Sequence, residues 1–152
     1  ASRIGQLTEA VESASGQCFT FEENDVLYGR LRPYPNKVWL ASFSGVCSTE
    51  FHVMRVRDQQ ALLPTYLAVV MRTQLIVAQT KHMMTGNTHP RLANEDVVNL
   101  LIPLADQSTQ QRIVDETLAC QAESARLRVH AETVWQQARE HFEKQLLKVG
   151  RV

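Results

Sequence analysis

Residues 107–148, QSTQQRIVDETLACQAESARLRVHAETVWQQAREHFEKQLLK, decide how this chain is organised. The stretch contains no proline or glycine and is rich in the helix formers Ala, Gln, Glu, Arg and Leu. At about 1.5 Å per residue, some forty helical residues make a rod roughly 60 Å long. A single helix of that length needs a partner to cover its apolar face. This end of the chain is therefore predicted to be a spacer and a docking surface.

Apolar residues recur in this stretch at helical spacing, in two runs. The first run takes steps of 4, 4, 3 and 4 through Val114, Leu118, Ala122, Ala125 and Val129. The second takes steps of 4, 3, 4 and 4 through Ala131, Trp135, Ala138, Phe142 and Leu146. Steps of three and four keep side chains on one face of a helix. The slip between the runs predicts a stripe that is wide or slightly rotated. The residues predicted to meet a partner helix are Val114, Leu118, Val129, Trp135, Phe142 and Leu146.

Length and composition indicate one compact domain and this helix. The 152 residues are predicted to divide into a globular part, 1–104, and a helical part, 105–150. No apolar run is long enough to span a bilayer and no signal-peptide pattern opens the chain, so no membrane is expected. The three cysteines, Cys18, Cys47 and Cys120, are widely spaced and odd in number, which favours a reduced, cytoplasmic setting. Cys47 and His52 alone fall short of a zinc site.

The charge is zero overall but unevenly distributed. Residues 1–25 carry five acids and one base, whereas residues 26–91 carry eight bases and two acids. From residue 107 onward seven basic residues face six acidic ones. A basic middle is expected of a surface that meets phosphates, and equally of an ordinary solvated surface.

The front part of the chain predicts a mixed α/β (α+β) fold with a small β-sheet and short helices. The expected elements are a helix at 4–14, strands at 25–31, 38–43 and 51–56, a helix at 64–80, a helical turn at 95–98 and a strand at 100–102. Asn94 is expected to cap the helical turn. One long C-terminal helix that pairs as a coiled coil completes the predicted fold.

The sequence offers no catalytic constellation. It has no phosphate-binding glycine loop, no nucleophile elbow and no Asn-Pro-Pro or Asp-Pro-Pro signature of adenine methyltransferases. The acidic cluster of Glu22, Glu23 and Asp25 is interpreted as a solvated turn before a strand. No enzyme, cofactor or metal is therefore predicted.

Two stretches instead supply hydrogen-bond donors suited to DNA. Arg and Lys can bond guanine, and Asn or Gln can bond adenine. The 30–37 stretch offers Arg30, Arg32, Asn36 and Lys37, and the 80–91 stretch offers Lys81, His82, Thr85, Asn87, Thr88, His89 and Arg91. Gly86 would let the backbone approach a groove or a phosphate closely.

Four ordered segments resemble the specificity subunits of type I restriction-modification systems. They are Asn24-Asp25-Val26-Leu27-Tyr28-Gly29-Arg30-Leu31-Arg32-Pro33-Tyr34, Gly45-Val46-Cys47-Ser48-Thr49-Glu50-Phe51, the stretch 86–92 with its His-Pro-Arg-Leu, and Ile102-Pro103-Leu104 with Gln110-Gln111-Arg112-Ile113-Val114. The resemblance covers about residues 24–118 and is specific, because the segments also keep the family's order and spacing.

The resemblance implies a target recognition domain that reads a DNA half-site, followed by a long helix. A full subunit has two such domains and two antiparallel helices that set the distance between half-sites. It also implies double-stranded DNA, adenine methyltransferase subunits and a translocating nuclease as partners, with no catalysis in the subunit itself. The family often has Pro-Pro where this chain has Ala105-Asp106, and Leu in place of Gln107, which predicts a less rigid junction. The segment before Asn24 is shorter than a complete recognition domain implies, so the chain is expected to be a half-subunit or a fragment.

Because family members read different sequences, their shared motifs cannot carry base choice. Arg30 and Arg32 are therefore expected to hold the fold together or to touch phosphate. Base choice is expected outside the motifs, in residues that could equally be plain surface: Asn36, Lys37, Lys81, His82, Asn87 and His89. Trp39, Tyr28 and Phe51 are interpreted as core rather than as stacking platforms.

The predicted function is sequence recognition in a DNA methyltransferase or restriction complex. The helix is expected to bind partners, as a homodimer or with the second half of a specificity subunit. One alternative is a helical protein-interaction module without sequence-specific DNA binding. Another is a recognition domain that belongs to a single-chain methyltransferase.

Overall fold

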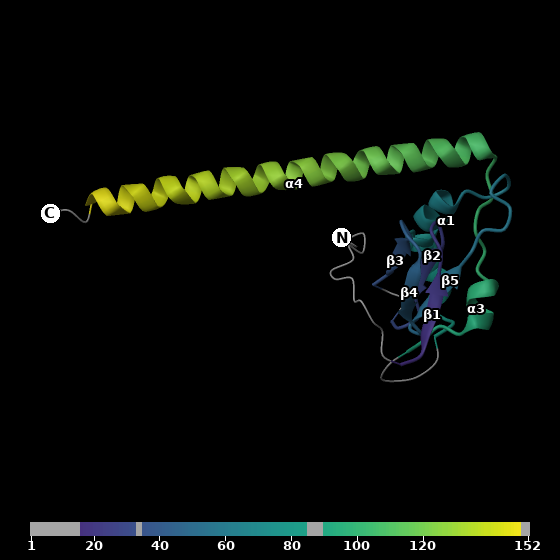
Figure 1. The fold of residues 1–152 in the computed structure, drawn as a ribbon. Helices are drawn as coiled ribbons and strands as arrows, with labels where there is room; N and C mark the ends of the chain where they lie inside the picture. The colour runs from purple at the N-terminus through teal and green to yellow at the C-terminus, as the bar shows by residue number, and fades with distance from the viewer. Residues whose placement is uncertain (1–15, 33–34, 85–89, 150–152) are drawn as a thin grey trace. The chain divides into compact units, whose positions relative to one another are not determined.

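The computed structural model of the chain describes residues 16–32, 35–84 and 90–149. In chain order, the described elements are β1 (Cys18–Phe21), β2 (Val26–Gly29), β3 (Val38–Leu40), β4 (Gly45–Ser48), β5 (Phe51–Met54), α1 (Pro64–Met71), α2 (Gln74–Thr80), α3 (Asn94–Val98) and α4 (Gln107–Val149). The expected class, a mixed domain of small sheets and short helices followed by one long helix, is confirmed (Figure 1). The helix expected at 4–14 lies outside the described residues.

The central sheet has three antiparallel strands in the order β3-β2-β5. Strand residues alternate between its faces. Val26, Tyr28 and Val38 point to one face and pack against α1 and α2 in the main core. Leu27, which pairs with Trp39 and Val53, points to the other face. Three of the four strands predicted from sequence, those at 25–31, 38–43 and 51–56, are present, and each is shorter than predicted.

A second sheet pairs β1 with β4, and the sequence prediction missed both strands. The sheet covers a smaller core of Phe21, Leu27 and Ala41. The Phe21 ring meets Trp39 edge-on with centroids 5.4 Å apart. Directly across the ladder, Gly45 leaves room for this ring, since an added Cβ would lie 3.0 Å from its nearest atom.

The single helix predicted at 64–80 is two helices, which corrects that prediction. Pro64 begins α1, as its missing N–H allows. The helix closes after Met71, where the Thr73 N–H and hydroxyl both donate to the Val70 carbonyl oxygen, at 2.9 and 2.7 Å. Thr73 is extended and α2 begins after it. The side-chain hydroxyl satisfies a carbonyl that a continuous helix would have used, so the chain turns here.

Two smaller predictions are also corrected. Asn94 is the first residue of α3 rather than its cap, and the Asp96 carboxylate accepts the Ala93 N–H at 3.1 Å. No strand forms at 100–102 in the part of the chain that the structure describes. The carboxamide of Gln79 instead bonds both backbone groups of Leu101, each at 2.9 Å. One side chain thus replaces the neighbouring strand that the prediction required.

The junction between domain and helix is built by Gln110, whose side chain is fully buried. Its amide group donates to the carbonyl oxygens of Ala61 and Ala105 at 2.8 Å, and its Oε1 accepts the Leu63 N–H at 2.8 Å. Asp106 caps α4 by accepting the Thr109 N–H at 3.0 Å and the hydroxyl groups of Ser108 and Thr109. These hydrogen bonds lower the pKa of Asp106 well below its usual value.

Helix α4 runs without a break from Gln107 to Val149, as the sequence predicted. The structure divides into two compact units with the boundary between Val114 and Asp115. The first two turns of α4 are grouped with the globular unit by this division. Among the described helices, none is long and apolar enough to cross a membrane.

The apolar stripe of α4 shifts to another side of the helix between its two runs, further than the wide or slightly rotated stripe that was expected. At about 100° per residue, the mean direction of the run from Leu118 to Val129 differs by roughly 130° from that of the run from Ala131 to Leu146. The two runs therefore lie on different sides of one regular helix. A single straight partner helix covers one run but not both.

Candidate nucleic-acid interface

The structure brings the two predicted donor stretches together. Leu31 forms an antiparallel bridge with Arg91. The Arg32 N–H donates to the Pro90 carbonyl oxygen at 2.9 Å, and the Leu92 N–H donates to the Arg30 carbonyl oxygen at 3.1 Å. Residues 30–32 and 90–92 therefore run side by side, although about sixty positions separate them in the chain. The backbone therefore allows side chains from both stretches to form one surface.

Both ends of the β2–β3 connection adopt the left-handed conformation. The φ angles are 49° at Arg32 and 50° at Asn36. Asn tolerates this region better than most residues. The Asn36 side chain is 8% exposed. Its burial argues against the base contact predicted for it, and its conformation gives it a role in shaping the loop.

Arg30 and Arg91 converge on Glu50 at the start of β5. Arg91 forms a two-pronged ion pair with the Glu50 carboxylate, with Nη2–Oε1 at 2.8 Å and Nε at 3.1 Å from both oxygens. Hydrogen bonds from Arg91, with the charges of Arg91 and Arg30, lower the pKa of Glu50. Arg30 is half-buried, and its Nη1 donates to the Thr49 carbonyl oxygen at 3.4 Å. The guanidinium groups of Arg30 and Arg91 thus organise the loop, and a DNA contact by Arg91 would compete with Glu50.

His52 and Tyr28 form a buried polar layer beneath this loop. Their rings stack with centroids 6.5 Å apart, and His52 Nε2 lies 3.2 Å from the Leu92 carbonyl oxygen. Burial lowers the pKa of His52, and the charge of Arg30 lowers it further. Burial raises the pKa of Tyr28. His52 is therefore neutral near pH 7, and its Nε2–H holds the backbone that follows Arg91.

Five of the predicted DNA-contacting residues are exposed in the described structure, namely Arg32, Lys37, Lys81, His82 and Arg91. Lys37 lies beside Gly29, whose N–H donates to the Lys37 carbonyl oxygen at 2.9 Å. Lys81 follows the last residue of α2, with its N–H bonded to the Val77 carbonyl oxygen at 3.1 Å. Their DNA contacts stay predictions. Thr85, Asn87 and His89 lie outside the described residues.

In the acidic turn before β2, Glu22 and Glu23 are exposed, as the interpretation of a solvated turn requires, whereas Asp25 is buried. Asp25 is 1% exposed, and its carboxylate accepts two hydrogen bonds from Arg55 at 2.8 Å. The same carboxylate accepts the Glu22 N–H at 2.7 Å, while Arg55 also pairs with Glu22. The hydrogen bonds from Arg55 lower the pKa of Asp25. The sequence contained this pair, but nothing in it placed Arg55 across the sheet from Asp25.

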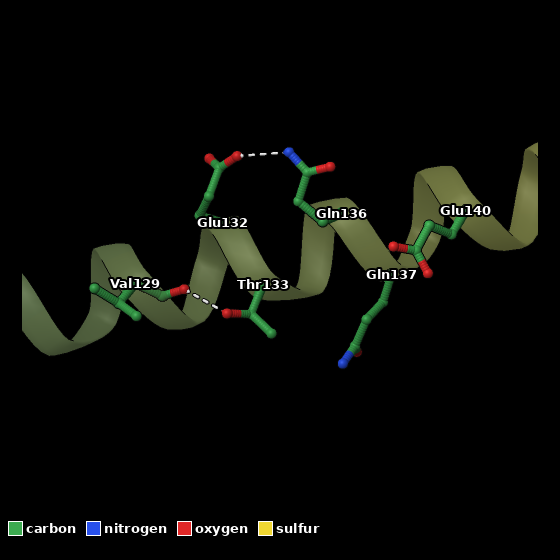
Figure 2. Close-up of a pocket in the computed structure, with 6 residues that line it drawn as sticks. All are labelled: Val129, Glu132, Thr133, Gln136, Gln137 and Glu140. Atoms are coloured by element: carbon green, nitrogen blue, oxygen red, sulfur yellow. Dashed lines mark hydrogen bonds between the residues drawn. The ribbon is translucent and has the colours of Figure 1, made fainter.

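The described residues hold no group of three His, Cys, Asp or Glu side chains placed to bind a metal ion. Figure 2 shows a shallow depression along α4 that is lined by Val129, Glu132, Thr133, Gln136, Gln137 and Glu140. Gln136 donates to Glu132 at 3.0 Å, and the Thr133 hydroxyl donates to the Val129 carbonyl oxygen at 2.9 Å. Because all its lining residues belong to one helix, the depression is a groove between side chains rather than a cavity.

The residues predicted to meet a partner helix divide into two groups. Val114 is 3% exposed and packs in the main core of the domain, so its side chain is already covered within this chain. The other five keep about half or more of their surface exposed: Leu118, Val129, Trp135, Phe142 and Leu146. Exposed apolar side chains of this size on one helix indicate an interaction surface.

Comparison with known proteins gives matches only among solved structures. No protein-family model matches the chain, and no curated protein matches it. One similar structure is the HsdS subunit from Thermoanaerobacter tengcongensis, with 30% identity and a TM-score of 0.63 over 74% of this chain and 30% of that chain. Another, from a study of complex assembly and conformational transition in a type I R-M system, has 29% identity and a TM-score of 0.65 over 79% of this chain and 32% of that one.

The fold defines a small mixed recognition-type domain that continues into a long helix. In fold and in sequence the chain is similar to the specificity subunits of type I restriction-modification systems, so the likeness inferred from the four motifs is confirmed. The chain spans about a third of the length of these structures.

Proposed function

We propose that this chain is a sequence-recognition module of a restriction-modification complex. The globular unit reads a DNA half-site, and α4 sets spacing and binds the partners that supply catalysis. The observation that carries the proposal is the joining of the 30–32 and 90–92 segments at one place in a fold shared with specificity subunits. Adenine methyltransferase subunits and a nuclease are the expected partners, and the chain itself performs no chemistry.

Within this proposal the exposed basic residues and the paired arginines have different roles. Arg30 and Arg91 are held by Thr49 and Glu50 and position the loop. Lys37, Lys81 and His82 are exposed and free of that task, so they meet phosphates or base edges. Phosphate contacts supply affinity and salt dependence, whereas a base contact supplies about 1–3 kcal/mol of discrimination.

A salt titration of duplex binding tests the proposal. The full chain, alone and with its partner methyltransferase, is added to a pool of mixed duplexes, and fluorescence anisotropy is recorded from low to moderate salt. We expect affinity to fall as salt rises, with Lys37→Ala and Lys81→Ala each reducing the logarithmic slope by about 0.9 if they neutralise a phosphate. Lys144→Ala, which removes an exposed basic residue far along α4, is the matched control and should leave the slope unchanged.

The same assay separates the proposal from the main alternative. The exposed stripe on α4 also fits a helical protein-interaction module whose basic surface is incidental. Binding that is absent even with the methyltransferase present, or that ignores salt, would favour that module.

A further inference from the structure

Residues 97–104, VVNLLIPL, divide their aliphatic side chains between the core and the solvent. Three of these side chains pack against the main core: Val97, Leu100 and Ile102. Three others are largely exposed: Val98 at 80%, Leu101 at 78% and Leu104 at 65%. Anchoring to the core explains the first three and leaves the exposed three without a role in stability. Together with the half-exposed Leu75 of α2, we call Val98, Leu101 and Leu104 the aliphatic patch.

Hydrogen bonds from side chains fix the backbone that carries the aliphatic patch. The carboxamide of Gln79 bonds both backbone groups of Leu101, and its nitrogen also donates to the Leu75 carbonyl oxygen at 3.3 Å. These bonds to one side chain bring the two leucines close together. The Tyr66 hydroxyl donates to the Pro103 carbonyl oxygen at 3.0 Å. Because the backbone is already ordered, a partner that covers the patch needs to order little of it on binding.

The charge around the aliphatic patch is acidic. From residue 92 to residue 111 the chain carries three acidic residues, Glu95, Asp96 and Asp106, and no Lys, Arg or His. Glu95 lies three residues before Val98 in α3, and Asp106 lies two residues after Leu104. Residues 26–91, in contrast, carry eight bases and two acids. Because acidic residues repel a phosphate backbone, the patch fits a protein partner rather than DNA.

From these observations we infer that the aliphatic patch binds a protein segment whose own aliphatic side chains are flanked by Lys or Arg. An apolar centre with a charged rim is the usual anatomy of a protein interface, and exposed apolar side chains gathered in one place mark such sites. The same patch of a second copy would bring acidic residues against acidic residues, which is electrostatically unfavourable. The inference concerns the globular unit alone and depends neither on DNA reading nor on the partners of α4.

Binding of two helical peptides tests the chemistry of the partner. The peptides have the same length and the same leucine face, which Lys flanks in one and Glu in the other, and each carries a fluorescein label. Fluorescence anisotropy is recorded with the full chain. We expect the Lys peptide to bind at least about tenfold more tightly than the Glu peptide at low salt, because the acidic rim attracts the first and repels the second. The difference should shrink as salt rises.

Substitutions locate the binding site on the chain. Val98→Ser and Leu101→Ser should each weaken binding of the Lys peptide about fivefold or more, because each removes an exposed apolar contact. Glu95→Lys should reduce the preference for the Lys peptide over the Glu peptide. Leu147→Ser, which removes a leucine of similar exposure from α4, is the matched control and should leave peptide binding unchanged. Urea unfolding checks that each variant keeps its stability, as expected for exposed positions.

Three outcomes would overturn the inference. The first is equal binding of the two peptides, and the second is a Leu101→Ser chain that binds the Lys peptide as tightly as the unchanged chain. The third comes from sedimentation velocity: a dimer that Leu101→Ser weakens and Leu147→Ser does not would assign the patch to a second copy. The salt titration of duplex binding is a separate measurement, so a failure of the peptide test would leave the proposed function standing.

Discussion

In the globular unit Tyr28, Met71 and Ile76 are at most 1% exposed, whereas on α4 Trp135 and Phe142 leave more than half of their surface in solvent. Large apolar side chains are thus buried in the globular unit and exposed on α4. The difference follows from geometry, because a sheet with helices on one face can bury its own apolar residues and a lone helix cannot. The two regions should therefore respond differently to substitution: the first in stability, the second in association.

Loss of the Gln110 side chain should have the largest effect on the globular unit. Gln110→Ala leaves the Leu63 N–H and the carbonyl groups of Ala61 and Ala105 without this partner. Because each buried unsatisfied group costs about 1–3 kcal/mol, we expect unfolding free energy to fall by about 3 kcal/mol or more. Urea unfolding followed by tryptophan fluorescence measures it. Gln107→Ala, an exposed glutamine at the start of α4, is the control, and an equal loss in both variants would contradict the role of Gln110.

The stability of the globular unit should also fall at acidic pH, in two steps. The pKa of His52 is lowered by burial and that of Asp25 by its hydrogen bonds from Arg55. In both cases the unfolded state binds the proton more tightly, so stability is full above the unfolded pKa and is lost as pH falls through the folded one. The first loss should begin below about pH 6.5 and the second below about pH 4.

Substitutions of His52 and Asp25 test which residue causes each of these two losses of stability. His52→Gln should remove the first step from the pH profile of the unfolding free energy and keep the second. Asp25→Asn should remove the second step and keep the first. A profile of the His52 variant that still falls between pH 6.5 and 5 would show that another group titrates there.

A smaller loss is expected from Gly45→Ala in β4. The new methyl group would lie 3.0 Å from the Phe21 ring, which already contacts Trp39 and Phe43. Crowding of this kind costs about 1–3 kcal/mol, and we expect the lower end because the smaller core lies near the surface. Thermal unfolding measures the change. Ser42→Ala, at an exposed position shortly before β4, is the control, and unchanged stability of the Gly45 variant would show that the Phe21 ring moves freely.

Elements that depend on neighbouring residues were predicted from the sequence, whereas elements that depend on pairing between distant residues were missed. Helix α4 was predicted within one residue, since composition and spacing are local properties. The strands β2, β3 and β5 were found from their apolar residues. Strands β1 and β4 were missed because their pairing joins residues such as Phe19 and Cys47, far apart in the chain and mixed in polarity.

The candidate interface was predicted as two separate stretches, and only the structure joined them. The bridge between Leu31 and Arg91 and the ion pair of Arg91 with Glu50 are long-range contacts that no local pattern reveals. The burial of Asn36 and Val114 likewise depends on neighbours supplied by the fold. The stripe on α4 could have been resolved from sequence, because helical geometry alone turns it at Val129.

The most direct test of the division between a reading domain and a spacing helix is a genome-wide map of methylated adenines. It is made in a host that carries the complete protein and its methyltransferase, with and without Lys37→Ala, Lys81→Ala and His82→Ala combined. The account predicts that the variant relaxes or changes one half of the methylated site and leaves the spacing between halves unchanged. A variant that methylates the original site with full fidelity would contradict it.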